Sequence, residues 1–218
     1  GQTLLQREDG SAILSIVREI CNKFNIVRDD WNGYNVLHNA AARVGGLDLG
    51  FVPPSGGQDV KGILEKSKNG DMDIVYLLGA DEIDISYLDN TFVIYQGHHG
   101  DKGAEVADVI FPGAAYCEKD STYVNTEGRV QRTHAAVPAP GNAKEDWKII
   151  RAFSEYINNV LPYNNISQLR SRFEEINKSF NIENSLIKSE PTDIGNTSVK
   201  LNNSKIQPKN INYFMTCP

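Results

Sequence analysis

The feature that most constrains the fold is an alternation of helical and strand patterns between residues 59 and 112. Alternating helices and strands of this length pack as a parallel sheet with helices on its faces. The sequence therefore predicts an α/β fold. The expected elements are a helix over 59–68 ended by Asn69-Gly70, strands over 73–78, 92–95 and 109–111, a helical turn over 103–108, and Pro112 closing the last strand.

Helical patterns also flank this region. Apolar residues recur at helical spacing in 9–24, where Asp9 or Ser11 can cap the first turn. The other predictions are a helix over 36–44 ended by Gly45-Gly46, a long ordered loop over 113–143 that is rich in Gly, Thr, Asn and Pro, a helix over 144–160, and one more helix over 169–176.

The composition changes after Pro162. Residues 177–212 are crowded with Asn, Ser, Lys and Thr, which cannot bury enough apolar surface to offset the entropy of ordering them. We therefore expect an α/β domain over residues 1–162 and a second segment, 163–218, that is helical and then an irregular C-terminal tail docking on partners. The expected anchors of that tail are Tyr213, Phe214 and Met215.

Charge and hydropathy narrow the classes of partner. The net charge is −6 with a pI near 5.3, so counterion release cannot drive binding to nucleic acid, and protein partners are expected. No apolar run approaches the about 20 residues that span a bilayer, so no direct membrane span is expected.

The cysteines and the first residue carry two further expectations. Cys21, Cys117 and Cys217 are too far apart for the clustered spacings of zinc and iron–sulfur sites, and we interpret them as reduced structural thiols. The first residue is Gly1, and no apolar signal segment follows it. We interpret this start as a removed presequence or as the later part of a longer chain.

Two loops after predicted strands could carry chemistry. Residues 77–81, Leu-Leu-Gly-Ala-Asp, end a parallel strand where open α/β sheets bind ligands, but they lack a phosphate-binding glycine pattern, which favours a plain turn. His98 and His99, with Asp101, could be imagined as metal ligands. Adjacent residues of an extended loop point in opposite directions, so satisfied loop histidines are favoured.

A third stretch contains a thiol and three carboxylates. Cys117 has no local signature of an activated nucleophile. Glu118, Asp120 and Glu127 could form an acid–base pair, but Lys119 and Arg129 are interleaved with them, which favours a salt-bridged loop. The sequence thus predicts no catalytic, cofactor-binding or metal-binding residues in this chain.

A long stretch resembles the molybdopterin oxidoreductase superfamily. Residues Ala107 to Pro112 match a helix end of the form ADVVLP, and the loop after it matches the form E-x-x-G-T-x-x-N-x-E-G-R-x-Q, except that Ser121 replaces glycine. The matching loop positions are Glu118, Thr122, Asn125, Glu127, Gly128, Arg129 and Gln131.

Within that superfamily the stretch is most similar to the large iron–sulfur subunits of respiratory complex I. Three segments carry this resemblance: the sequence from Gln96 to Gln131, the LLGAD segment, and the stretch from Glu145 to Tyr163. It covers about residues 3–163, and NYFMT near residue 213 is also similar.

The resemblance implies a molybdopterin-oxidoreductase-like sheet and the C-terminal part of that subunit. The subunit's iron–sulfur clusters are expected in an N-terminal part, so no cofactor is expected here. In catalytic relatives the regions of Gly79 and of Asn125 to Arg129 would approach a pterin dinucleotide. The complex I form is expected to have kept the fold and lost the cofactor, so that these residues become internal hydrogen-bonding partners.

The resulting hypothesis is a non-catalytic scaffold in the peripheral arm of complex I. Its expected partners are other peripheral-arm subunits and the N-terminal cluster-bearing part of the same subunit. The expected location is the matrix side of the mitochondrial inner membrane, or the cytoplasmic side of a bacterial plasma membrane. The first alternative is the C-terminal part of an active molybdopterin guanine dinucleotide oxidoreductase. The second is an independent nucleotide-binding module, which the missing phosphate loop disfavours.

Overall fold

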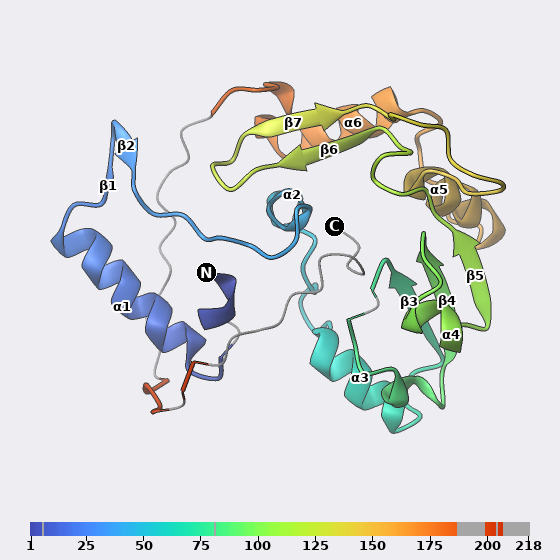
Figure 1. Ribbon diagram of the computed structural model, residues 1–218, viewed down its shortest axis with the longest axis horizontal. Coiled ribbons are helices and arrows are strands. Elements are labelled where there is room, and N and C mark those ends of the chain that lie inside the picture. The colour runs from blue at the N-terminus through green and yellow to red at the C-terminus, as the bar shows by residue number, and fades with distance from the viewer. Residues whose placement is uncertain (6, 81, 187–198, 204, 207–218) are drawn as a thin grey trace.

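The computed structural model describes residues 1–5, 7–80, 82–186, 199–203 and 205–206 (Figure 1). Tyr213, Phe214, Met215 and Cys217 lie outside the described residues. In the part of the chain that is described, no helix is both long and apolar enough to cross a membrane.

A three-stranded parallel sheet lies at one side of the fold, and the alternating pattern predicts it (Figure 1). Its strands are β3 (Ile74–Leu78), β4 (Phe92–Gly97) and β5 (Val109–Pro112), in the order β3-β4-β5. Ile74 pairs with Phe92, and Ile94 pairs with Val109. Pro112 is the last residue of a strand at the end of the order, where its missing amide disturbs no central ladder.

One face of the sheet packs against α3, α4 and a short 3-10 helix. Helix α3 (Val60–Lys68) begins at Asp59, whose carboxylate accepts from the amide of Gly62, and α4 is Lys102–Val106. Between them η2 (Ile85–Leu88) adds Leu88 to the core. The buried residues of this core are Val75, Leu77, Leu88, Val93 and Tyr95.

The opposite face packs against α5 (Asp146–Tyr156). The ring of Phe153 lies 6.0 Å from the ring of Tyr76 and 5.9 Å from that of Phe111. The helix is shorter than the predicted 144–160, because it ends before Asn158, whose φ of 55° is left-handed and breaks the helical path.

The predicted loop over 113–143 is wrong, because it contains an antiparallel hairpin. Its strands are β6 (Ser121–Val124) and β7 (Val130–Thr133). Thr122, Tyr123 and Val124 are good strand formers, and Gly128, at a φ of 86°, allows the turn between the strands. The abundant turn residues around the hairpin concealed these short strands.

The prediction of a helix over 36–44 is also wrong. The observed α2 is Arg43–Asp48, so Gly45-Gly46 lies inside the helix and does not end it. A Cβ on Gly45 would lie 3.4 Å from Cγ2 of Val124, so this glycine allows the helix to approach the hairpin closely. Close packing, rather than helix termination, explains why glycine stands there.

Helix α6 (Ile166–Ile176) packs beside the hairpin (Figure 1). It begins before the predicted residue 169, because the Asn165 side chain caps it by accepting from the amide of Gln168 at 2.9 Å. Phe173 of α6 and Phe180 of the 3-10 helix η3 (Lys178–Asn181) pack against Val124 and Val130. Residues of the predicted 163–218 segment therefore contact the hairpin.

The amino-terminal part begins with the 3-10 helix η1 (Gln2–Leu4), followed by the predicted helix, α1 (Gly10–Lys23). A small hairpin of β1 (Val27–Arg28) and β2 (Trp31–Asn32) comes next. Asp9 binds the segment 199–203, since its Oδ2 accepts from the amide of Asn202 at 3.0 Å. Its Oδ1 accepts from Arg7 Nε at 2.7 Å.

Candidate functional site

A cavity of about 540 Å³ opens at the carboxyl ends of β3 and β4. This is the edge where open α/β sheets bind ligands. Its walls come from the sheet, the segment around α2, the strand β6 and the helices α5 and α6. The lining residues that carry charge are Arg43, Lys119, Asp120, Glu145 and Asp146.

The floor of the cavity holds a chain of polar contacts centred on Gln96. Gln96 is 0% exposed, and its Oε1 accepts a hydrogen bond from the Tyr76 hydroxyl at 2.5 Å. Its Nε2 donates to Asp146 Oδ1 at 2.8 Å, and the other carboxylate oxygen of Asp146 accepts from Lys119 Nζ at 2.6 Å. We call Tyr76, Gln96, Asp146 and Lys119 the floor cluster. Its polar groups pair with one another.

Tyr76 of the floor cluster and His98 of the cavity lining both have shifted pKa values. Desolvation, with a smaller contribution from the Asp146 charge, raises the pKa of Tyr76. Desolvation lowers the pKa of His98, and so do the nearby His99 and Lys119. Both shifts favour the neutral form.

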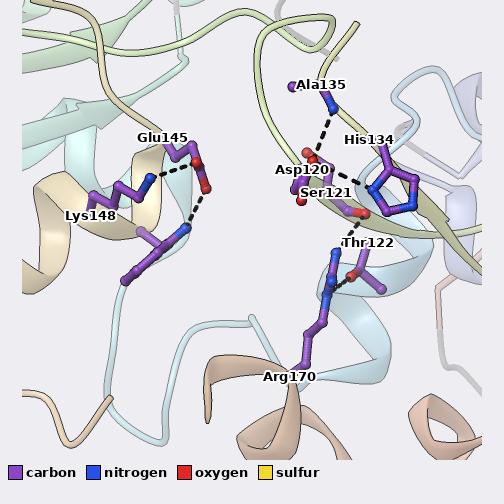
Figure 2. A network of polar contacts seen from close by, with 9 residues as sticks. Asp120, Ser121, Thr122, His134, Ala135, Glu145, Lys148 and Arg170 are labelled. Atoms are coloured by element: carbon purple, nitrogen blue, oxygen red, sulfur yellow. Dashed lines mark hydrogen bonds and ion pairs between the residues drawn. The ribbon is translucent and has the colours of Figure 1, made fainter. Parts of the chain in front are cut away.

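The amino-terminal end of α5 brings the carboxylates of Glu145 and Asp146 to the cavity. Figure 2 shows Glu145 and its contact with Lys148. One oxygen of Glu145 accepts from Trp147 Nε1 at 2.6 Å, and the other accepts from Lys148 Nζ at 2.7 Å. Glu145 precedes the helix and Asp146 lies in its first turn. The positive end of the helix dipole therefore already has two acidic side chains beside it.

Strand β6 carries polar contacts of its own (Figure 2). Asp120 Oδ1 accepts from the amide of Ala135 at 2.9 Å and lies 3.7 Å from His134 Nδ1. Arg170 of α6 reaches the strand, with Nε donating to Thr122 Oγ1 at 3.3 Å. The Asp120 contacts join the two ends of the hairpin, and the Arg170 bond holds β6 against α6.

Of the strand-end residues considered from sequence, Gly79 lines the cavity and Asp81 lies outside the described residues. The expectation that His98 and His99 point in opposite directions is wrong, because their ring centroids are 4.3 Å apart. The chain leaves the extended conformation after Gly97 and bends at both histidines, so the alternation of a strand does not apply. Among the described residues, no three His, Cys, Asp or Glu side chains are placed to hold a metal ion.

Asp101 has a structural position beside these histidines. Its Oδ1 accepts from the amide of Gly103 at 3.0 Å and caps α4, and its Oδ2 accepts from the Tyr95 hydroxyl at 2.6 Å. Both carboxylate oxygens are therefore used by the fold.

The motif residues of the hairpin also bond within the protein. Asn125 Oδ1 accepts from the amides of Glu127 and Arg129, each at 3.0 Å, and so holds its own turn. Glu118 Oε2 accepts from the amide of Ala115 at 2.9 Å, and Glu127 lies 3.7 Å from Arg129. Neither Asn125 nor Arg129 lines the cavity, whereas Gly79 does.

Cys21 and Cys117 are free thiols. The residues that sequence reasoning missed are those of the floor cluster. The available signal was Gln96, a polar residue that closes the apolar strand Phe92–Tyr95 at its carboxyl end. Its hydrogen-bond partners Tyr76 and Asp146 are 20 and 50 positions away, and no local pattern connects them.

The chain is similar over most of its length to known proteins. The model of the molybdopterin oxidoreductase family matches residues 1–156. The chain is 49% identical over 178 residues to the NADH-ubiquinone oxidoreductase 75 kDa subunit of Reclinomonas americana, covering 81% of this chain and 25% of that protein. It is 41% identical over 216 residues to an NADH-quinone oxidoreductase subunit of Rickettsia conorii, covering 99% of this chain and 30% of that protein.

A fungal relative gives a similar result. The chain is 50% identical over 178 residues to the mitochondrial NADH-ubiquinone oxidoreductase 78 kDa subunit of Candida albicans, covering 81% of this chain and 23% of that protein. The chain thus spans between 23% and 30% of the length of these relatives.

Proposed function

Because this chain belongs to the molybdopterin oxidoreductase family, we propose that it is a non-catalytic scaffold part of the large iron–sulfur subunit of respiratory complex I. Three relatives named as NADH-ubiquinone or NADH-quinone oxidoreductase subunits, at 41% to 50% identity, support this assignment. In this role the chain supports electron transfer from NADH to quinone through clusters held elsewhere in the subunit. Its partners are other subunits of the peripheral arm and the cluster-bearing part of its own subunit.

The floor cluster is the observation that supports a scaffold role most. A ligand site normally presents polar groups that can hydrogen-bond to the ligand. Buried polar groups without a hydrogen-bond partner lower the stability of the folded protein. Here the side-chain oxygen of Gln96 accepts from Tyr76, its side-chain nitrogen donates to Asp146, and Asp146 also binds Lys119. The cluster connects β3, β4, α5 and the segment before β6, so it stabilises the fold at the family's ligand edge.

The charges around the cavity do not fit a pterin dinucleotide. Such a cofactor carries a diphosphate, which helix amino termini and basic side chains bind. The lining has three carboxylates, on Asp120, Glu145 and Asp146, against two basic side chains, on Arg43 and Lys119. Lys119 is engaged by Asp146, and the amino end of α5 is flanked by Glu145. A diphosphate placed there would meet like charge.

The cavity itself favours the second candidate, the C-terminal part of an active molybdopterin guanine dinucleotide oxidoreductase. Its position at the carboxyl ends of β3 and β4 and its volume of about 540 Å³ suit a ligand site. The charge balance disfavours it. Molybdenum or tungsten bound at one equivalent per subunit would support this candidate against the scaffold.

Co-purification tests the proposed role directly. We expect an affinity tag on the full-length protein to recover an assembly that oxidises NADH and reduces quinone, with the clusters visible by electron paramagnetic resonance. Recovery of the protein alone, or in an assembly without this activity, would refute a role in complex I.

For the location, we propose the matrix side of the mitochondrial inner membrane, or the cytoplasmic side of a bacterial plasma membrane. Both mitochondrial and bacterial proteins are among the relatives. Protease protection in intact and opened organelles or vesicles distinguishes this side from the opposite one.

A further inference from the structure

Two neighbouring histidines turn the chain at the carboxyl end of β4. The strand ends at Gly97, the chain bends at His98 and His99, and α4 begins after Asp101. His98 lines the cavity, and its ring centroid lies 4.3 Å from that of His99 at an interplanar angle of 64°. Two imidazole rings in contact interact electrostatically when either one binds a proton. The pair therefore places a titrating group in the wall of the cavity.

Two carboxylates face His98, and both already accept hydrogen bonds within the fold. Asp146, in the first turn of α5, accepts from Gln96 and from Lys119. Glu118, in the segment before β6, accepts from a backbone amide at 2.9 Å. The other charged residues of the cavity lining are Arg43, Asp120 and Glu145. The floor cluster is therefore complete while His98 is neutral.

A proton on His98 adds positive charge near Lys119. Burial is the largest of the causes that lower the pKa of His98, followed by His99 and Lys119, whereas Asp146 and Glu118 act in the opposite direction and less. The ordinary pKa of histidine is 6.5, so the stabilisation that depends on neutral His98 is complete above pH 6.5 and is lost as the pH falls below it. The neutral ring is the form that suits the folded protein.

We propose that His98 is an acid-sensitive switch of this fold, whose protonation loosens the floor cluster. The protonated ring repels Lys119 and attracts Asp146, so it competes with the bond of 2.6 Å between these two side chains. Asp146 also accepts from Gln96, so a movement of its carboxylate weakens the contact of α5 with β4 as well. The carboxyl edge of the sheet is therefore held more tightly at neutral pH than in acid. All of these groups lie in the described residues, so the inference does not depend on the proposed role in complex I.

The first test measures the titration of His98. Hydrogen–deuterium exchange at the imidazole Cε1 carbon, read by tandem mass spectrometry of the full-length subunit, reports the pKa of a single histidine. We expect the pKa of His98 to lie below 6.5 and to rise in His99→Gln, because one opposing charge is removed. His134→Gln is the matched control, because the His134 side chain is 82% exposed and lies 3.7 Å from Asp120. A pKa of His98 that is not below 6.5, or that His99→Gln leaves unchanged, would overturn the proposal.

The second test measures the loosening itself. Amide hydrogen exchange of the full-length subunit would be compared at about pH 7.5 and about pH 5.5, after correction for the intrinsic rates. We expect protection of 92–101 and of 144–156 to fall at least about 3-fold in acid in the wild type, and by less than about 1.5-fold in His98→Gln. Helix α3 contains no histidine and is the internal reference. An equal loss in both proteins, or no loss in the wild type, would contradict the switch.

A second variant keeps this test decisive should His98→Gln not fold. In His99→Gln the raised pKa of His98 is expected to move the loss of protection to a higher pH. A loss of protection whose midpoint does not follow the pKa of His98 would show that another group is responsible, and the proposal would be wrong.

Discussion

Replacing Gln96 with leucine tests how much the floor cluster stabilises the protein. Leucine keeps most of the volume of glutamine, so the change removes hydrogen bonds and creates little empty space. The Tyr76 hydroxyl loses its acceptor, and Asp146 loses one of its donors but keeps Lys119. The lost hydrogen bond between Tyr76 and Gln96 costs about 1 kcal/mol, and the lost bond to the Asp146 carboxylate costs about 1.5–3 kcal/mol. We expect Gln96→Leu to lower the free energy of unfolding by about 2–4 kcal/mol.

The assay is urea unfolding monitored by circular dichroism and Tyr and Trp fluorescence, with the slope checked for constancy. Gln131→Leu is the matched control, because Gln131 lies in a strand, β7, and is exposed. We expect the control to change stability by less than about 0.5 kcal/mol. Equal effects of the two variants would refute the claim that the cluster stabilises the sheet edge.

Three further outcomes are expected. The pKa of Asp9 is lowered from an ordinary 3.8 to about 2, mainly by its hydrogen bond with Arg7. The ionised Asp9 side chain therefore stabilises the folded protein fully above pH 3.8, and this contribution is lost as the pH falls to about 2. The stability difference between wild type and Asp9→Asn should shrink over that range in unfolding curves, and a constant difference would contradict it. Asn125→Ala should destabilise the hairpin by about 1–2 kcal/mol in urea unfolding, because two amides lose their acceptor, and an unchanged midpoint would show that the turn forms without it. Asp146→Asn should lower the raised pKa of Tyr76 only partway, because desolvation by burial remains. The pKa of Tyr76 is read by ultraviolet titration, as the difference between each protein and the same protein carrying Tyr76→Phe. An unchanged pKa would show that the two groups are uncoupled.

The parallel sheet could be predicted from sequence because its signals are local. The apolar runs that become β3 and β4, and the Asn69-Gly70 stop of α3, are each read within a few residues. Helix α2 could not be predicted, because its Gly45 allows a close contact with Val124, which is distant in sequence.

The location of the candidate site could be predicted from the sequence, but the residues that form its floor could not. The carboxyl edge of the sheet follows from the topology, and Gly79 lies there as expected. The cluster below it depends on Gln96, Lys119 and Asp146, which meet only when β4, the segment before β6 and α5 come together. The direction of His98 and His99 also depended on a bend after β4 that strand alternation does not describe.

Cofactor analysis of the intact protein tests the central claim most directly. The purified assembly would be assayed for molybdenum and tungsten by inductively coupled plasma mass spectrometry, and for pterin by fluorescence after oxidation. We predict iron in the amounts of the clusters and less than about 0.05 equivalents of molybdenum, tungsten or pterin per subunit, because the cavity carries three carboxylates and its floor pairs internally. One equivalent of a pterin with its metal would contradict the account.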